Sequence, residues 1–159
     1  MTIKYFKYSK KTLPAIIAGS IEIYAESGQH IEKQLHKYEN LKVGIGFIPN
    51  FQSNSVYQYR HTDKWGIWDP KSNTAWIQTE GHPDPMRTLR HELLHACQSL
   101  SVEAKEEIAQ EAKSRSSWKE VSREVKELYP PPKWDIEIPV WVLQHDEVIT
   151  DYFINKYLK

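Results

Sequence analysis

The stretch DPMRTLRHELLHACQSL, residues 84–100, decides how this chain is expected to fold. Asp84 is a favourable N-cap residue and Pro85 is favoured at the first position of a helix, so a helix is predicted to begin here. Apolar residues then recur at helical spacing, and no glycine or proline interrupts them. The stretch therefore predicts an amphipathic helix over residues 86–100.

The same predicted helix carries an H-E-x-x-H pattern at residues 91–95. His91 and His95 are four positions apart, so their side chains lie about 40° apart around a helix and share one face. Both imidazoles can reach one Zn²⁺ ion at roughly 2.0–2.1 Å. Glu92 lies beside them and can reach a water on the metal without binding the metal itself. The pattern is typical of a zinc peptidase with Glu92 as general base, whereas the plainer alternative is two ordinary histidines.

Length and composition indicate one domain over residues 1–159. The 21 basic and 21 acidic residues balance, and this neutral charge argues against a nucleic-acid partner, although six Trp and nine Tyr could stack on bases. No apolar run follows Met1 and no segment approaches 18 continuous apolar residues, so neither a signal peptide nor a membrane partner is expected. The single cysteine, Cys97, fits a reducing compartment and is expected to be a buried apolar side chain. We therefore expect a cytoplasmic protein.

The order of predicted elements indicates an α+β fold. A helix is predicted from Pro14 to about Tyr38, followed by a small antiparallel sheet. Strands are predicted over residues 3–8, 41–48, 56–60, 65–68 and 74–79. After the motif helix, helices are predicted over residues 102–113 and 118–128, and three prolines at 130–132 end the second one. A last helix, capped by Asp135, is predicted to run to about Leu158.

A catalytic zinc ion usually takes three protein ligands and one water. Positions 98 and 101 are Gln and Ser, so the third histidine of the H-E-x-x-H-x-x-G-x-x-H pattern is absent. A carboxylate is the remaining choice, and the last predicted helix offers Glu137 and Glu147. If Glu147 is the ligand, Asp151 one turn later could orient a ligand histidine. These residues alone leave both carboxylates open.

The segment RHELLHACQ, residues 90–98, resembles the R-H-E-x-x-H-x-x-Q helix of small bacterial, cyanobacterial and phage zinc peptidases of the gluzincin type. In gluzincins a Glu on a later helix completes the metal site. The segment WDIEIPVW, residues 134–141, resembles the W-x-x-E-x-E-A-like stretch of the short gluzincins at Glu137 and has Pro139 at the second Glu. The segment DEVITD, residues 146–151, resembles the N-E-x-x-S-D stretch of thermolysin-like gluzincins at Glu147. The short gluzincins are the closer match to the first motif, which favours Glu137.

This resemblance implies a zincin-like fold and a zinc-dependent endopeptidase that acts on peptide or protein substrates. The implied Zn²⁺ ligands are His91, His95 and Glu137, with Glu92 as the catalytic residue. Pro139 at the second Glu leaves a zinc-binding regulatory or interaction module without hydrolysis as the alternative.

The family layout also implies roles for residues outside the two motifs. The strand over residues 74–79 would be the edge of the sheet, where a substrate peptide could add by backbone hydrogen bonds. Gln98 is expected on the helix face of His91, or bonded to a neighbouring loop. A second donor to the developing oxyanion is expected among Tyr129, His145, Tyr152 and Tyr157.

Overall fold

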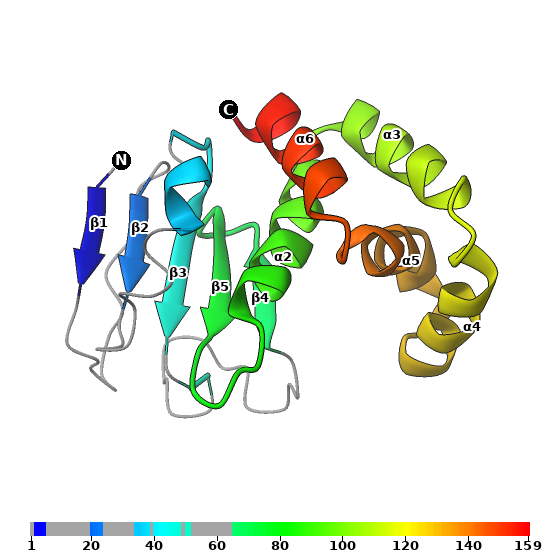
Figure 1. Ribbon diagram of the computed structural model, residues 1–159, viewed down its shortest axis with the longest axis horizontal. Helices are drawn as coiled ribbons and strands as arrows, with labels where there is room; N and C mark the ends of the chain where they lie inside the picture. The colour runs from blue at the N-terminus through cyan, green and yellow to red at the C-terminus, as the bar shows by residue number, and fades with distance from the viewer. Residues whose placement is uncertain (1, 6–19, 24–33, 39, 49, 52–64) are drawn as a thin grey trace.

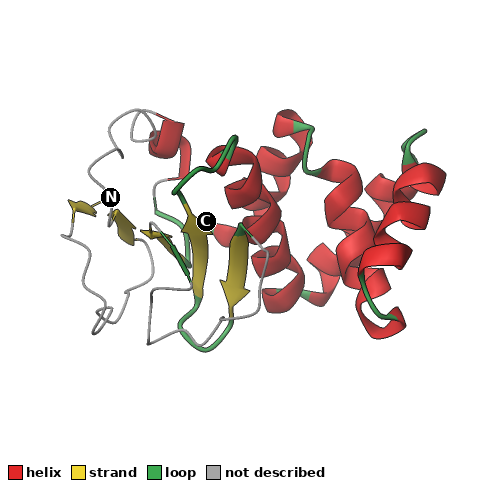
Figure 2. Ribbon diagram, turned by 90° about the horizontal axis from the view of Figure 1, so that it is seen from below, coloured by secondary structure: helices red, strands yellow, loops and turns green. Residues whose placement is uncertain are grey.

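The computed structural model describes residues 2–5, 20–23, 34–38, 40–48, 50–51 and 65–159. Within these residues the sheet lies at one side of the molecule and helices α3, α4 and α5 at the other, with α2 and α6 between them (Figure 1). Figure 2, turned by 90°, shows the same separation of strands from helices. The predicted α+β class is confirmed.

A five-stranded mixed sheet has the strand order β1-β2-β3-β5-β4. The strands are β1 (Thr2–Tyr5), β2 (Ser20–Ile23), β3 (Gly44–Ile48), β4 (Gly66–Asp69) and β5 (Thr74–Gln78). β1, β2, β3 and β5 run parallel, and β4 alone pairs antiparallel, with β5. The predicted antiparallel sheet is therefore wrong. Short apolar runs do not reveal strand direction, whereas the long segments between these strands provide the dozen or more residues that a parallel crossover needs.

The edge of the sheet beside the helices is β4, so the expectation that residues 74–79 form the edge is also wrong. β5 lies between β3 and β4, and the register pairs Gly66 with Ile77 and Asp69 with Thr74. The turn joining β4 to β5 is held by the buried Asp69 carboxylate, which accepts bonds from the Lys71 backbone N–H at 3.0 Å and the Ser72 hydroxyl at 2.8 Å. This tight turn returns the chain antiparallel and leaves β4 outermost.

The predicted N-terminal helix is wrong over residues 20–23, which form β2. The described end of that region contains a short 3-10 helix, η2 (His36–Tyr38). Residues 14–19 and 24–33 of the predicted helix, residues 6–8 of the first predicted strand and the predicted strand over 56–60 lie outside the described residues.

The helices that follow agree with the sequence prediction up to residue 128. They are α2 (Pro85–Leu100), α3 (Val102–Lys113) and α4 (Trp118–Leu128), followed by the 3-10 helix η3 (Pro131–Lys133). The Asp84 carboxylate accepts a bond from the Arg87 backbone N–H at 3.1 Å, as expected of an N-cap.

The last predicted helix is instead two helices, α5 (Trp134–Leu143) and α6 (Glu147–Leu158). The break falls at residues 144–146, where the Asp146 carboxylate caps α6 by accepting from the Ile149 N–H at 3.1 Å. Asp135 does not cap α5, because it lies within the first turn and the N-cap position is Lys133. The local cap at Asp146 competes with continuation of α5 and starts a new helix there.

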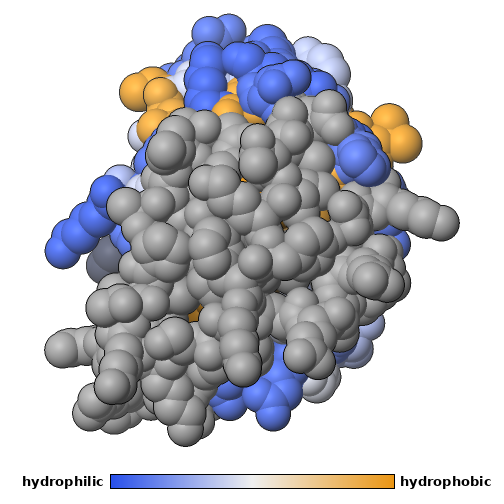
Figure 3. All heavy atoms as spheres, turned by 90° about the vertical axis from the view of Figure 1, so that its left-hand side faces the viewer, coloured by the Kyte–Doolittle hydropathy of each residue, from blue (hydrophilic) through white to orange (hydrophobic). Residues whose placement is uncertain are grey.

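The core forms around α2, which packs against β4 and β5 and also against α3, α5 and α6. Its apolar face is fully buried, including Leu89, Leu93, Leu94 and Cys97. Cys97 is thus the buried small side chain that the sequence predicted. In the described part of the chain, no helix is long and apolar enough to cross a membrane. On the face shown in Figure 3, the described atoms at the margin are mainly hydrophilic, with small separate hydrophobic groups.

Candidate metal centre

Three side chains from two helices meet at the middle of α2. His91 and His95 extend from α2, and Glu137 extends from the first turn of α5. The two Nε2 atoms are 3.1 Å apart, and Glu137 Oε2 is 3.6 Å from His91 Nε2 and 3.3 Å from His95 Nε2. The structure therefore brings together two imidazole nitrogens and one carboxylate oxygen that could hold a metal ion.

These distances fit one tetrahedral ion. Two ligand atoms bound at roughly 2.0–2.1 Å with tetrahedral angles are about 3.3–3.4 Å apart. The observed separations of 3.1, 3.3 and 3.6 Å lie on both sides of that value. All three side chains are almost fully enclosed, with 11% or 12% of their surface exposed.

Two glutamines determine which nitrogen of each histidine faces the centre. Gln98 Nε2 donates to the Ile136 backbone oxygen at 3.0 Å, so Gln98 Oε1 faces His95 Nδ1 at 2.9 Å. Gln144 Oε1 lies 3.0 Å from His91 Nδ1, and Gln144 Nε2 lies 3.4 Å from His145 Nε2. An amide oxygen can only accept, so each Nδ1 carries a proton, and in the neutral form of each ring Nε2 presents a lone pair. Gln98 thus contacts both a ligand-type histidine and a neighbouring segment.

A cluster of three acceptor atoms is unfavourable without a cation or proton between them. Glu137 Oε2 is buried and has no hydrogen-bond donor among the described residues. Burial alone would raise the pKa of Glu137, but its contacts with His91 and His95 hold that pKa well below its usual range. Burial lowers the pKa of His95, yet its contacts with Glu137 and the charge of Glu92 outweigh burial and raise it. These three ligand atoms therefore fit a bound cation.

Glu92 is buried beside this cluster and does not belong to it. It lines the same cavity but is not one of the grouped ligand atoms. Its side chain passes close to β4: a Cβ placed on Gly66 would be 2.9 Å from Glu92 Oε1. Gly66 therefore lets the edge strand approach the carboxylate closely.

A cavity of about 730 Å³ opens over the cluster, between β4, α2 and α5. Aromatic side chains form much of its wall, among them Trp65, Trp68 and Trp141. Trp141 meets the His91 ring edge-on, with ring centroids 6.0 Å apart. The cavity can therefore enclose an extended ligand next to the three atoms that could hold a metal ion.

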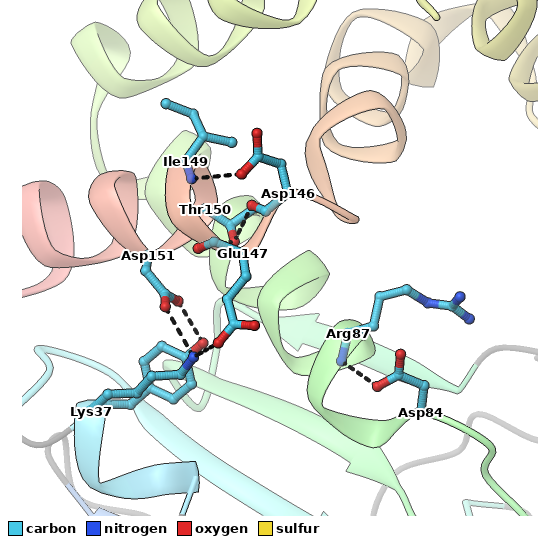
Figure 4. Close-up of polar contacts among 9 residues, drawn as sticks. Lys37, Asp84, Arg87, Asp146, Glu147, Ile149, Thr150 and Asp151 are labelled. Atoms are coloured by element: carbon cyan, nitrogen blue, oxygen red, sulfur yellow. Dashed lines mark hydrogen bonds and ion pairs between the residues drawn. The ribbon is translucent and has the colours of Figure 1, made fainter.

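Glu147, the other carboxylate considered from the sequence, lies elsewhere. Its side chain pairs with Lys37 of η2, and Asp151 accepts bonds from Lys37 Nζ at 3.0 Å and from the Tyr38 hydroxyl at 2.7 Å (Figure 4). Asp151 therefore ties α6 to η2 and contacts neither histidine.

The structure also separates the four candidates for an oxyanion donor. Tyr129 and His145 line the cavity. Tyr152 is 52% exposed on α6, and Tyr157 stacks on Phe153 and lies beneath Lys156 Nζ. Tyr152 and Tyr157 do not line the cavity.

Two residues of the site were missed from the sequence. Gln144 is the C-cap residue of α5, at the start of a helix break that the sequence did not reveal. Gly66 looks like an ordinary interruption of a short strand. A glycine inside a strand does signal close approach of another group, and that signal was available for Gly66.

No family model, curated protein or solved structure matches this chain.

Proposed function

We propose that this protein is a zinc-dependent endopeptidase of the gluzincin type, with His91, His95 and Glu137 as metal ligands and Glu92 as general base. The observation that carries the proposal is the convergence of two Nε2 lone pairs and one carboxylate oxygen at tetrahedral spacing. A set of two imidazoles and one carboxylate, with a carboxylate on the next residue of the helix, is the donor set of hydrolytic zinc sites.

When bound, zinc would polarise the peptide carbonyl and make the attacking water more acidic. Glu92 would accept the proton of that water and deliver it to the leaving amine. Tyr129 and His145, which line the cavity, are the candidates to donate a hydrogen bond to the developing oxyanion. Gln98 and Gln144 would hold the histidine rings in the orientation that presents Nε2.

The backbone of β4 would bind the substrate. β4 pairs with β5 on one side and is the outermost strand of the sheet order on the other. Gly66 to Trp68 line the cavity, so a peptide lying there could hydrogen-bond to the strand as an added β-strand. This geometry would hold the scissile carbonyl beside the metal ligands.

Glu92→Gln tests the chemistry separately from metal binding. We expect purified wild-type protein to hold about one zinc ion per chain and to cleave an unstructured protein substrate. Glu92→Gln should keep the zinc, because Glu92 is not a ligand, and lose at least about 100-fold in kcat. Zinc retention with no hydrolysis by the wild type would instead favour the non-hydrolytic module.

Metal content of two further variants tests the ligand set. Glu137→Ala should lose the zinc, whereas Glu147→Ala, which removes an exposed partner of Lys37, should retain it. Absence of zinc from the wild type after zinc is supplied would contradict the whole proposal.

A further inference from the structure

Apart from two carboxylates, the formally charged residues that line the cavity are all basic, although the chain as a whole is neutral. Among the described residues that line the cavity, the acidic ones are Glu92 and Glu137, both used in the proposed chemistry. The other formally charged residues that line it, Arg87, Lys105 and Lys133, are basic. A bound Zn²⁺ would offset the two carboxylates, which leaves the three cations as the net charge facing a substrate.

The three cations lie on both sides of the metal cluster. Arg87 is one helical turn before His91 on α2, roughly 6 Å along the axis. Lys133 directly precedes α5 and lies four residues before Glu137, on the same side of that segment. Lys105 is in the first turn of α3, beyond the end of α2, and bonds Asp135 in the first turn of α5. A peptide that crosses the cluster would therefore meet a cation on each side.

These cations are available to a ligand. In the described part of the chain, no acidic side chain forms an ion pair with Arg87 or Lys133. The Asp84 carboxylate binds the backbone N–H of Arg87, and the guanidinium extends away from it (Figure 4). The Lys105–Asp135 pair is largely exposed, at 41% and 66%, so solvent weakens it and a ligand can compete for the lysine.

The charge of Arg87 reaches the far wall of the cavity. Burial lowers the pKa of His145, and the positive charge of Arg87 lowers it further, by more than the negative charge of Asp84 raises it. His145 lies on the segment between α5 and α6, opposite α2. Arg87 therefore contributes to the potential inside the cavity and not only to the solvent-facing surface.

We propose that the cleft selects acidic substrates: peptides that carry Glu or Asp on both sides of the bond to be cleaved, held by Arg87 on one side and by Lys105 and Lys133 on the other. This selectivity rests on the proposed peptidase function. Fixed cations at the mouth of an enclosed site attract and orient anionic ligands, and the effect weakens as salt screens it.

Three fluorogenic peptides of one sequence, differing only in having Glu, Gln or Lys at the flanking positions, test this selectivity. We expect kcat/KM for the Glu peptide to exceed that for the Gln peptide about tenfold at low salt, with the Lys peptide slowest. The ratio of Glu to Gln peptide should fall towards one at about 0.5 M NaCl. Arg87→Gln and Lys133→Gln should each lower that ratio about threefold. Lys113→Gln is the matched control, because Lys113 is exposed at the end of α3 and does not line the cavity.

Binding to the zinc-loaded Glu92→Gln protein, followed by tryptophan fluorescence, gives a readout that does not need hydrolysis. Equal binding and equal cleavage of the Glu and Gln peptides would overturn the selectivity and leave the peptidase function standing. Preferential binding of the Glu peptide without cleavage by the wild type would support the acidic-ligand site and overturn the peptidase function. If no peptide is bound or cleaved, both proposals fail.

Discussion

The backbone of Gly66 on β4 lies close to the side chain of Glu92 on α2, the candidate general base. A methyl group on Gly66 would lie 2.5 Å from Thr88 Cγ2 and 2.8 Å from Glu92 Cγ. Gly66→Ala should therefore displace the Glu92 side chain and lower kcat about 100-fold, because misplacement by about 1 Å is that costly. Peptide hydrolysis measures the loss, and zinc content should stay unchanged because no ligand moves. Full activity with the alanine in place would show that Glu92 does not need this space.

The buried thiol of Cys97 should make the free energy of unfolding depend on pH. Burial raises the pKa of its thiol from 9.0 to about 12. The thiol ionises near pH 9 in the unfolded chain but stays protonated in the folded protein. The contribution of the buried thiol to the free energy of unfolding is therefore complete below pH 9 and is lost as pH rises towards 12. Between pH 8 and 10, the free energy of unfolding of the wild type should fall by about 1.4 kcal/mol relative to Cys97→Ala. Urea titrations of both proteins at the two pH values measure the difference; parallel pH dependence would refute it.

Single residues of the site were predictable where one helix sets their spacing. His91, Glu92 and His95 need only helical geometry to be placed together. The choice between Glu137 and Glu147 depends on how α5 packs on α2, which no local pattern encodes. The bond from Gln144 to His91 depends further on where α5 ends.

Helices α2, α3 and α4 were predictable as elements because helical patterns run through each of them. Asp84 and Pro85 mark the start of α2, and the prolines at 130–132 stop the chain after α4. The helix break at residues 144–146 was not, since no glycine or proline marks it, apolar residues lie on both sides of it, and Asp135 and Asp146 are both plausible caps. Strand direction was not predictable either, because β1, β2 and β3 pair with strands distant in sequence.

The two aspartates give a matched test of that helix boundary. Asp146 accepts from the Ile149 N–H and pairs with Arg115 at 2.8 Å, whereas Asp135 is exposed and contacts Lys105. Asp146→Ala should lower the free energy of unfolding by about 1 kcal/mol through loss of the cap. Asp135→Ala should lower it by less than about 0.5 kcal/mol. Thermal unfolding of the two variants compares them, and a larger effect at Asp135 would place the main cap at the start of α5.

Across the whole molecule, a polar cluster of Lys37, Tyr38 and Asp151 joins the η2 segment beside the sheet to α6 (Figure 4). The Tyr38 ring is buried, and burial together with the bond to Asp151 raises the pKa of its hydroxyl well above the usual range. Asp151→Ala removes the acceptor of a buried hydroxyl and should lower the free energy of unfolding by about 2 kcal/mol.

Glu147→Ala is the control for this prediction, since Glu147 is 60% exposed and its pair with Lys37 is solvent-screened. It should change stability by less than about 0.5 kcal/mol. Both variants should keep their zinc, because the cluster lies apart from the histidines. Zinc loss in Asp151→Ala would mean that this contact also positions the metal site.

The three candidate ligand atoms come from two different helices, α2 and α5, so a bound ion would also affect the stability of the fold. An ion bound to His95 and Glu137 would cross-link two helices whose connection runs through the whole of α3 and α4. Such a cross-link closes a long loop and restricts the unfolded chain much as a disulfide does. Chelation would then loosen the packing of α3 and α5 on α2, together with α4, which packs on α5, before it disturbs the sheet, which contributes no ligand. A bound metal would thus hold α2 and α5, which line the cavity, in a fixed relative position.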